Sequence, residues 1–281
     1  MGITLASLSM LCAVWNDLVF KSVRRDNPVH AGRFVAGIGV IWTLVFALPL
    51  LFSDQPSQWQ GWFYALLAGG ASAAANIMLI DCLARVDVGV GSTVYRLNLV
   101  WVMILSFLFL DESLTVAKMA AMTLGLLAIL LLSGVSSGLS LKAIVQPAFK
   151  VLLLASVLRA LMGFFYKLAL ADGMGQKELL VVSGVCWIVA GVASAWPSRQ
   201  DGPVIAYSRW VLLSGVLVCG IVFFLSRALA CTDASVAVPI SQFNFVGTAA
   251  LGIILFNEPL TLRKGAGLAA ACVAVLLLAV G

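Results

Sequence analysis

The stretch 108-LFLDESLTVAK-118 returns near the end of the chain as 254-ILFNEPLTLRK-264. In both copies an apolar run leads to a Glu, a Leu-Thr pair and a Lys, and Glu112 and Glu258 lie 146 residues apart. The same offset holds without a gap along much of the chain, pairing Lys21 with Lys167, Asp87 with Asp233, Asn98 with Asn244 and Lys118 with Lys264. Chance similarity between Leu- and Ala-rich segments does not explain paired charges and amides, so the sequence predicts a duplication.

The composition is that of a membrane protein. Of 281 residues, 62% are hydrophobic and 10% are charged, whereas soluble domains hold about 45–50% apolar and about 25% charged residues. A membrane-spanning helix needs about 20 mostly apolar residues. The apolar runs are continuous and do not alternate as barrel strands do, so they predict an all-α integral membrane protein.

Polar breaks divide the chain into ten predicted transmembrane helices, five in each half: 3–20, 31–52, 60–84, 88–110, 115–134, 149–170, 177–196, 208–230, 234–256 and 261–280. An odd number of spans makes the second half enter the membrane from the opposite side, so we expect two inverted five-helix repeats. The predicted organisation is a first repeat at 1–134, a Gly/Ser-rich linker at 135–148 and a second repeat at 149–281.

Two halves of five spans, each with a fourth helix running into LFLDESLT or ILFNEPLT before a Gly/Ala-rich fifth helix, resemble the EamA family of the drug/metabolite transporter (DMT) superfamily. Pro239 in AVPISQF fits the family's habit of a proline in that helix, whereas Thr93 occupies the matching place in the first half. The resemblance implies a secondary transporter with a central cavity, often an exporter of amino acids or other small metabolites. We therefore expect a multi-pass protein of the bacterial inner membrane.

Two arginines stand out among the sparse polar residues of the spans. Arg159 lies at the centre of the sixth span and Arg96 near the centre of the fourth. Such residues usually face a cavity or a partner, and a guanidinium binds a carboxylate through two parallel hydrogen bonds. An alternative role for both is to bridge backbone carbonyls between helices. The other candidate substrate-binding residues are Asn76, Asn98, Trp101, Tyr166, Gln242 and Asn244, of which Asn98 and Asn244 are equally explained as interhelical hydrogen bonds.

The acidic residues of the motif and of the first span have local explanations. Asp17 can pair with Lys21 at i,i+4, which we favour, or carry a coupling proton. Glu112 and Glu258 are predicted to be structural caps, since each precedes a helix whose first N–H groups lack partners. Pro259 supports this interpretation because proline suits a first helical turn.

Several chemistries are not indicated. The chain has one histidine, His30, six dispersed cysteines and no nucleotide-binding motif, so we expect no cofactor, no metal and no enzyme activity. The net charge of +5 lies at membrane edges and does not suggest nucleic acid. We predict export, by alternating access, of a small carboxylate-bearing metabolite such as an amino acid or an amino-acid-derived compound, including an opine-like metal chelator.

Alternatives stay open at this point: import of a vitamin or nucleotide-like metabolite, or a polytopic enzyme acting on lipid, which would need clustered acids or a catalytic histidine. The partners we expect are a small-molecule substrate and the lipid bilayer; coupling to protons and a monomeric or homodimeric state are open. The basic residues favour external termini by the positive-inside rule, whereas the family resemblance favours cytoplasmic termini.

Overall fold

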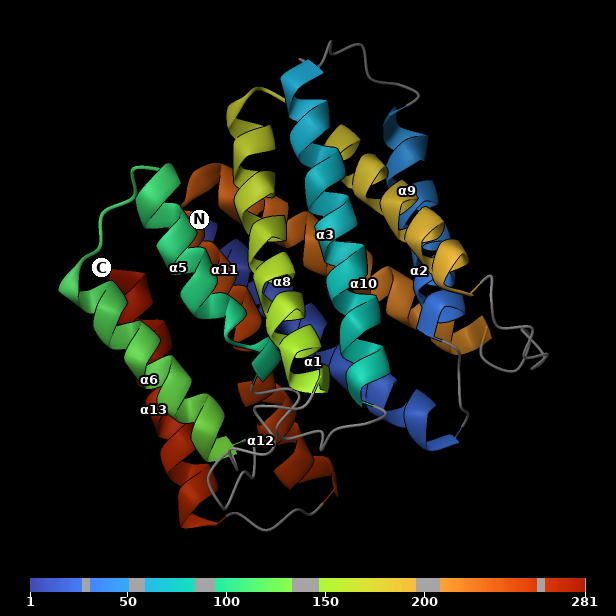
Figure 1. The fold of residues 1–281 in the computed structure, drawn as a ribbon. Coiled ribbons are helices and arrows are strands. Elements are labelled where there is room, and N and C mark those ends of the chain that lie inside the picture. Colours follow the sequence, from blue (N-terminus) through green and yellow to red (C-terminus); the bar gives the residue numbers. More distant parts are fainter. Residues whose placement is uncertain are drawn as a thin grey trace.

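The computed structural model describes residues 1–26, 31–50, 59–83, 94–132, 147–195, 208–256 and 261–280, and every regular element in these ranges is a helix. The first half contains α1 (Gly2–Asp26), α2 (Ala31–Leu50), α3 (Trp59–Leu83), α5 (Asn98–Phe109) and α6 (Val116–Leu132). The second contains α8 (Pro147–Ala171), α9 (Gln176–Ala195), α10 (Ser208–Cys231), α11 (Ala234–Gln242), α12 (Asn244–Phe256) and α13 (Leu262–Val280). Together they form a helical bundle (Figure 1).

Every predicted span overlaps at least one helix. Seven helices, α1, α2, α3, α8, α9, α10 and α13, are long and apolar enough to cross a membrane, while α5 and α6 are shorter apolar helices. The predicted linker lies outside the described residues except for Pro147 and Ala148, which begin α8, and the start of the fourth predicted span, 88–93, also lies outside them.

The ninth predicted span is two helices, which corrects the expectation of one helix per span. α11 ends at Gln242 and α12 begins at Asn244, with the break at Phe243. The Phe243 N–H donates to the carbonyls of Pro239 and Ile240, 3.1 and 3.2 Å away, a tight final turn. In the first half a turn at 96–97 precedes α5 at the position that the 146-residue offset makes equivalent. Polar residues lie at both breaks, Arg96 and Asn98 in the first half and Gln242 and Asn244 in the second, but the apolar segments on either side make each span one continuous hydrophobic run.

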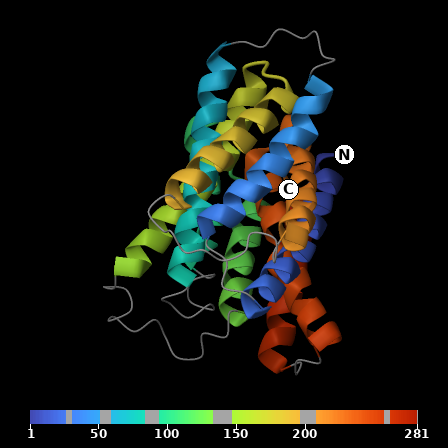
Figure 2. The ribbon, with the colours of Figure 1, turned by 90° about the vertical axis from the view of Figure 1, so that its right-hand side faces the viewer.

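The helix pairing is the same when the two halves are exchanged. α1 packs on α10 and α3 packs on α8, while α2 pairs with its counterpart α9 and α6 with its counterpart α13. The α6–α13 pair forms one side of the bundle (Figure 1), and α12 and α13 lie at one end of the molecule in the rotated view (Figure 2). This places the fifth and tenth spans at the periphery of the bundle.

Small residues bring some helices into backbone contact. A Cβ atom added to Gly191 of α9 would lie 2.6 Å from the Gly32 carbonyl oxygen and the Ala36 nitrogen of α2. In the small-residue run that begins at Gly69 in α3, a Cβ at Gly69 would lie 2.8 Å from the Cα of Ser183 in α9. These approaches hold α2, α3 and α9 close together.

Candidate functional site

A polar network is centred on the break between α11 and α12. Arg96 Nη1 donates to the backbone carbonyl of Gln242 at 2.8 Å and to Asn244 Oδ1 at 3.1 Å. The guanidinium also lies over the Phe245 ring, 4.5 Å from its centroid. The break leaves the Gln242 carbonyl available, because the Val246 N–H that would bind it in a continuous helix donates to Phe243 instead.

Asn244 connects Arg96 to the carboxylate of the first span. Its Nδ2 donates to Asp17 Oδ2 at 2.6 Å, and the Thr248 hydroxyl donates to the same oxygen at 3.1 Å. Asp17 therefore contacts the second repeat. The side chain of Lys21 lies outside the described side chains, so the predicted Asp17–Lys21 pair stays a prediction.

Gln242 connects the network to the second arginine. In the orientation of its amide that satisfies both groups, the Gln242 side-chain oxygen accepts from Nε and Nη2 of Arg159, each at 3.2 Å. Arg159 Nη1 lies 3.4 Å from the Met162 sulfur. Within the described residues, no carboxylate lies at hydrogen-bonding distance from either guanidinium. Both arginines are therefore held by neutral acceptors and carry charge that a ligand can complement.

The network unites five of the predicted residues and one that was missed. It draws on the first, fourth, sixth and ninth predicted spans, and its members are Asp17, Arg96, Arg159, Gln242, Asn244 and Thr248. Thr248 was not predicted, although its position four residues after Asn244 places both side chains on one helix face.

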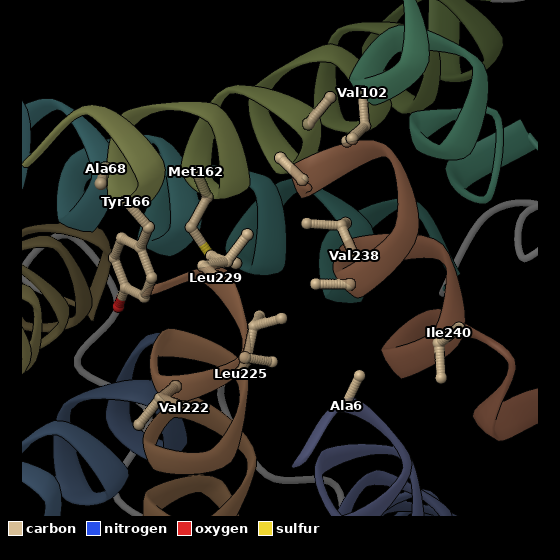
Figure 3. Close-up of a cluster of buried hydrophobic side chains, with 14 of the residues drawn as sticks. Ala6, Ala68, Val102, Met162, Tyr166, Val222, Leu225, Leu229, Val238 and Ile240 are labelled. Carbon is tan, nitrogen blue, oxygen red and sulfur yellow. The ribbon is translucent and has the colours of Figure 1, made fainter. Parts of the chain in front are cut away.

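The remaining predicted binding residues make no hydrogen bond to this network within the described part of the chain. Trp101 Nε1 donates to Ser156 Oγ at 3.2 Å, joining α5 to α8, and Asn76 donates to the Ser72 carbonyl of its own helix at 2.8 Å. Tyr166 is fully buried in the apolar core, in the same cluster as Met162 and Leu229 (Figure 3), and makes no hydrogen bond to the network. Asn98 is also fully buried, and neither of its amide atoms has a hydrogen-bond partner in the described part of the chain.

Glu112 caps a different helix from the one expected. Its Oε1 accepts from the Ala234 N–H at 2.6 Å and its Oε2 from the Ser235 N–H at 2.9 Å, so it caps α11 of the other repeat. The following helix, α6, is capped by the Thr115 hydroxyl, which accepts from the Lys118 N–H at 3.2 Å. The left-handed φ of 53° at Asp111 turns the chain after α5, a conformation that Asp adopts more readily than most residues. Glu258 and Pro259 lie outside the described residues.

The described residues contain no group of three or more His, Cys, Asp and Glu side chains that could hold a metal ion. The network is therefore a site for hydrogen bonds and charge pairing. Arginines contacting the carbonyl end of a broken helix, with a carboxylate one amide away, resemble the binding sites that discontinuous helices form in secondary transporters.

Comparison with known proteins identifies the family of the chain. The model of the EamA-like transporter family matches the chain twice, over residues 1–134 and 147–280. A solved structure, described only as the crystal structure of a protein, superposes with a TM-score of 0.79, covering 98% of this chain and 95% of the other at 17% identity, which shows a shared fold. No curated protein matches the sequence. Because the family model covers nearly the whole chain in two copies, the protein belongs to the EamA-like transporter family, within the DMT superfamily, and is a multi-pass membrane protein.

Proposed function

We propose that this protein is a secondary transporter that exports a small carboxylate-bearing metabolite by alternating access between two inverted five-helix repeats that together form ten spans. The observation that carries the proposal is the pair of arginines that contact Gln242, at the break between α11 and α12. Two guanidiniums and one carboxylate leave the network with a formal excess of one positive charge. A buried charge needs a partner, and a carboxylate is the ligand that a guanidinium binds best.

The network also suits a cargo that has an amino group. Asp17 accepts hydrogen bonds only from an amide and a hydroxyl among the described residues, so a cargo ammonium group can replace them. An α-amino acid, or a compound made from one, presents a carboxylate for the arginines and an ammonium group for Asp17. A second carboxylate on the cargo would balance the remaining positive charge, so we favour acidic or opine-like amino acids.

Coupling to protons follows from the same geometry. A proton on Asp17 removes the negative charge that would hold the cargo's ammonium group, so proton binding and cargo binding compete at this carboxylate. Such competition produces exchange of protons for cargo, which can drive export when protons enter. Export is also the direction that the resemblance to the family favours.

The experiment that tests the proposal begins with ligand-dependent stability of the purified protein. A panel of amino acids and opine-like acids is compared with matched amides or esters that lack the carboxylate. A true ligand at about 100 times its Kd stabilises the folded state by about 2.7 kcal/mol, and the uncharged analogue should not. Equal stabilisation by both members of each pair would contradict carboxylate recognition.

Transport of the ligand is then measured in proteoliposomes with an imposed pH gradient. The wild-type protein should accelerate transport when the gradient is present. Asp17→Asn should weaken binding of a cargo that has an amino group, and the exchange of labelled for unlabelled ligand that remains at raised ligand concentration should lose the acceleration. An Asp17→Asn protein with an unchanged response to the gradient would remove Asp17 from proton coupling.

A further inference from the structure

The N-terminus of α11 is held by the other half of the protein. Both carboxylate oxygens of Glu112 accept backbone N–H groups there, from Ala234 at 2.6 Å and from Ser235 at 2.9 Å. Glu112 is 8% exposed, so these hydrogen bonds are shielded from solvent. A carboxylate at this place pairs with N–H groups that have no partner inside the helix and complements the helix dipole.

A second contact between the repeats lies beside the first. Lys118 of α6 is 2% exposed, and its Nζ donates to Asp233 Oδ2 at 2.7 Å and to the Ser113 carbonyl at 3.1 Å. Asp233 is the residue before α11, and its side chain makes no capping hydrogen bond of its own. Removing either partner of this contact leaves a poorly compensated charge at the edge of the core.

α11 connects these contacts to the arginine network. All nine of its residues are buried, and at 1.5 Å per residue it is about 13 Å long. It begins beside Asp233 and ends at Gln242, which contacts Arg96 through its carbonyl and Arg159 through its side chain. Because a short helix in a close-packed interior moves as a unit, displacement of its first residue also displaces Gln242.

We propose that Glu112, Lys118 and Asp233 form a lock that closes one end of the bundle, and that α11 transmits the state of the lock to the two arginines. The closed end is the one that holds the N-terminus, since Gly2 lies against Thr232 beside the lock. The inference rests on the alternating access of the proposed function. A cargo carboxylate that takes the Arg96 N–H groups from the Gln242 carbonyl frees the far end of α11, so cargo binding weakens the lock.

Hydrogen–deuterium exchange on the full-length protein in nanodiscs tests the lock without any cargo. Lys118→Met and Glu112→Gln should each accelerate exchange across 234–242 about tenfold or more, the change expected from losing one charge-assisted hydrogen bond. Exchange in α9 should stay unchanged, which separates local opening from general loss of stability. The matched control is Lys264→Met at the equivalent position of the second repeat, which should leave 234–242 unchanged.

Transmission along α11 needs a variant at the other end of the helix. Arg96 lies beside Gln242, at the end of α11 opposite to Ala234 and Ser235. Arg96→Gln should nevertheless accelerate exchange of the Ala234 and Ser235 amides. If Lys118→Met does not accumulate in the membrane, Asp233→Asn breaks the same ion pair at a half-exposed residue. The lock would be overturned by unchanged exchange across 234–242 in the lock variants, or by an equal acceleration of exchange in α9. Transmission along α11 would be overturned if exchange accelerated in the lock variants but not in Arg96→Gln. Carboxylate recognition is tested separately, by the ligand-dependent stability of the purified protein, so its failure can be distinguished from failure of the lock.

Discussion

The two arginines should respond differently to replacement by glutamine, because the structure holds them differently. Arg96 makes two hydrogen bonds through Nη1 and lies over an aromatic ring, and its removal leaves the Gln242 carbonyl without that donor. Each charge-assisted hydrogen bond contributes about 1.5–3 kcal/mol, so Arg96→Gln should cost about 3 kcal/mol or more of stability. Among the described residues, the polar contacts of Arg159 are one amide oxygen and a sulfur, and a glutamine at 159 can still donate to Gln242.

Arg159→Gln should therefore lose less than about 1.5 kcal/mol of stability while weakening carboxylate binding by about ten- to a hundredfold. Arg159→Lys should restore binding only in part, since an ammonium cannot form two parallel hydrogen bonds with a carboxylate. Unfolding temperature and ligand affinity are measured on the same purified samples at matched membrane abundance. Unchanged affinity in Arg159→Gln would refute carboxylate recognition by Arg159, and a stability loss equal to that of Arg96→Gln would assign it a structural role.

Three further predictions concern packing and topology. In thermal unfolding, Gly191→Ala should destabilise the protein by about 1–3 kcal/mol, because its new methyl group meets the α2 backbone. The control Gly70→Ala, whose Cβ meets nothing within 4 Å, should be neutral or stabilising by up to about 1 kcal/mol. Trp101→Phe should cost about 1 kcal/mol, the loss of one hydrogen bond to Ser156, measured in the same assay. Reporter enzymes fused after Gly281 and inserted within 135–146 should report opposite sides of the membrane, because five spans separate the two sites; the same side for both would contradict the inverted repeat.

Much of the network could be predicted from the sequence because charged residues in apolar spans are rare. Asp17, Arg96 and Arg159 each interrupt a hydrophobic run, and an ionisable group at membrane depth needs a partner. Gln242 and Asn244 were identifiable because the 146-residue offset pairs them with Arg96 and Asn98. The sequence thus identified five of the six members of the network as candidate residues, although it favoured a local partner for Asp17 and left open which atoms they contact.

The helix breaks and the cap could not be predicted from local rules. The spans containing 96–97 and Phe243 are apolar when averaged over the length of a membrane span, despite the polar residues at each break, and hydropathy does not register the direction of a backbone carbonyl. Pro239 was the only local signal, and the first half lacks it. Glu112 was assigned to the nearest helix start, but its hydrogen bonds go to residues 122 and 123 positions away. Tertiary contacts overrode the local capping preference there.

The two repeats share a backbone break but differ in the chemistry placed on it. Asn98 and Asn244 are equivalent in the 146-residue register, yet only Asn244 lies between an arginine and a carboxylate. The residue equivalent to Asp17 is Gly163, where an added Cβ would lie 2.8 Å from a Val238 methyl carbon. The packing of the second repeat therefore leaves little room for an acid, which explains why the buried amide of Asn98 has no hydrogen-bond partner among the described residues.

This asymmetry restricts how a cargo can bind. Arg96 and Asp17 come from the first repeat, while Arg159 comes from the second, where the first repeat has Ala13 at the equivalent position. A cargo with a carboxylate at one end and an amino group at the other therefore finds one favourable orientation, although the helices around it are paired symmetrically. Under the proposed alternating access, the duplicated scaffold moves between two conformations, and the charges that we propose to select the cargo are ones that the duplication did not preserve. Substitutions in the network should consequently change which compound is carried, and substitutions at the closely packed Gly69 and Gly191 should change how readily the helices move.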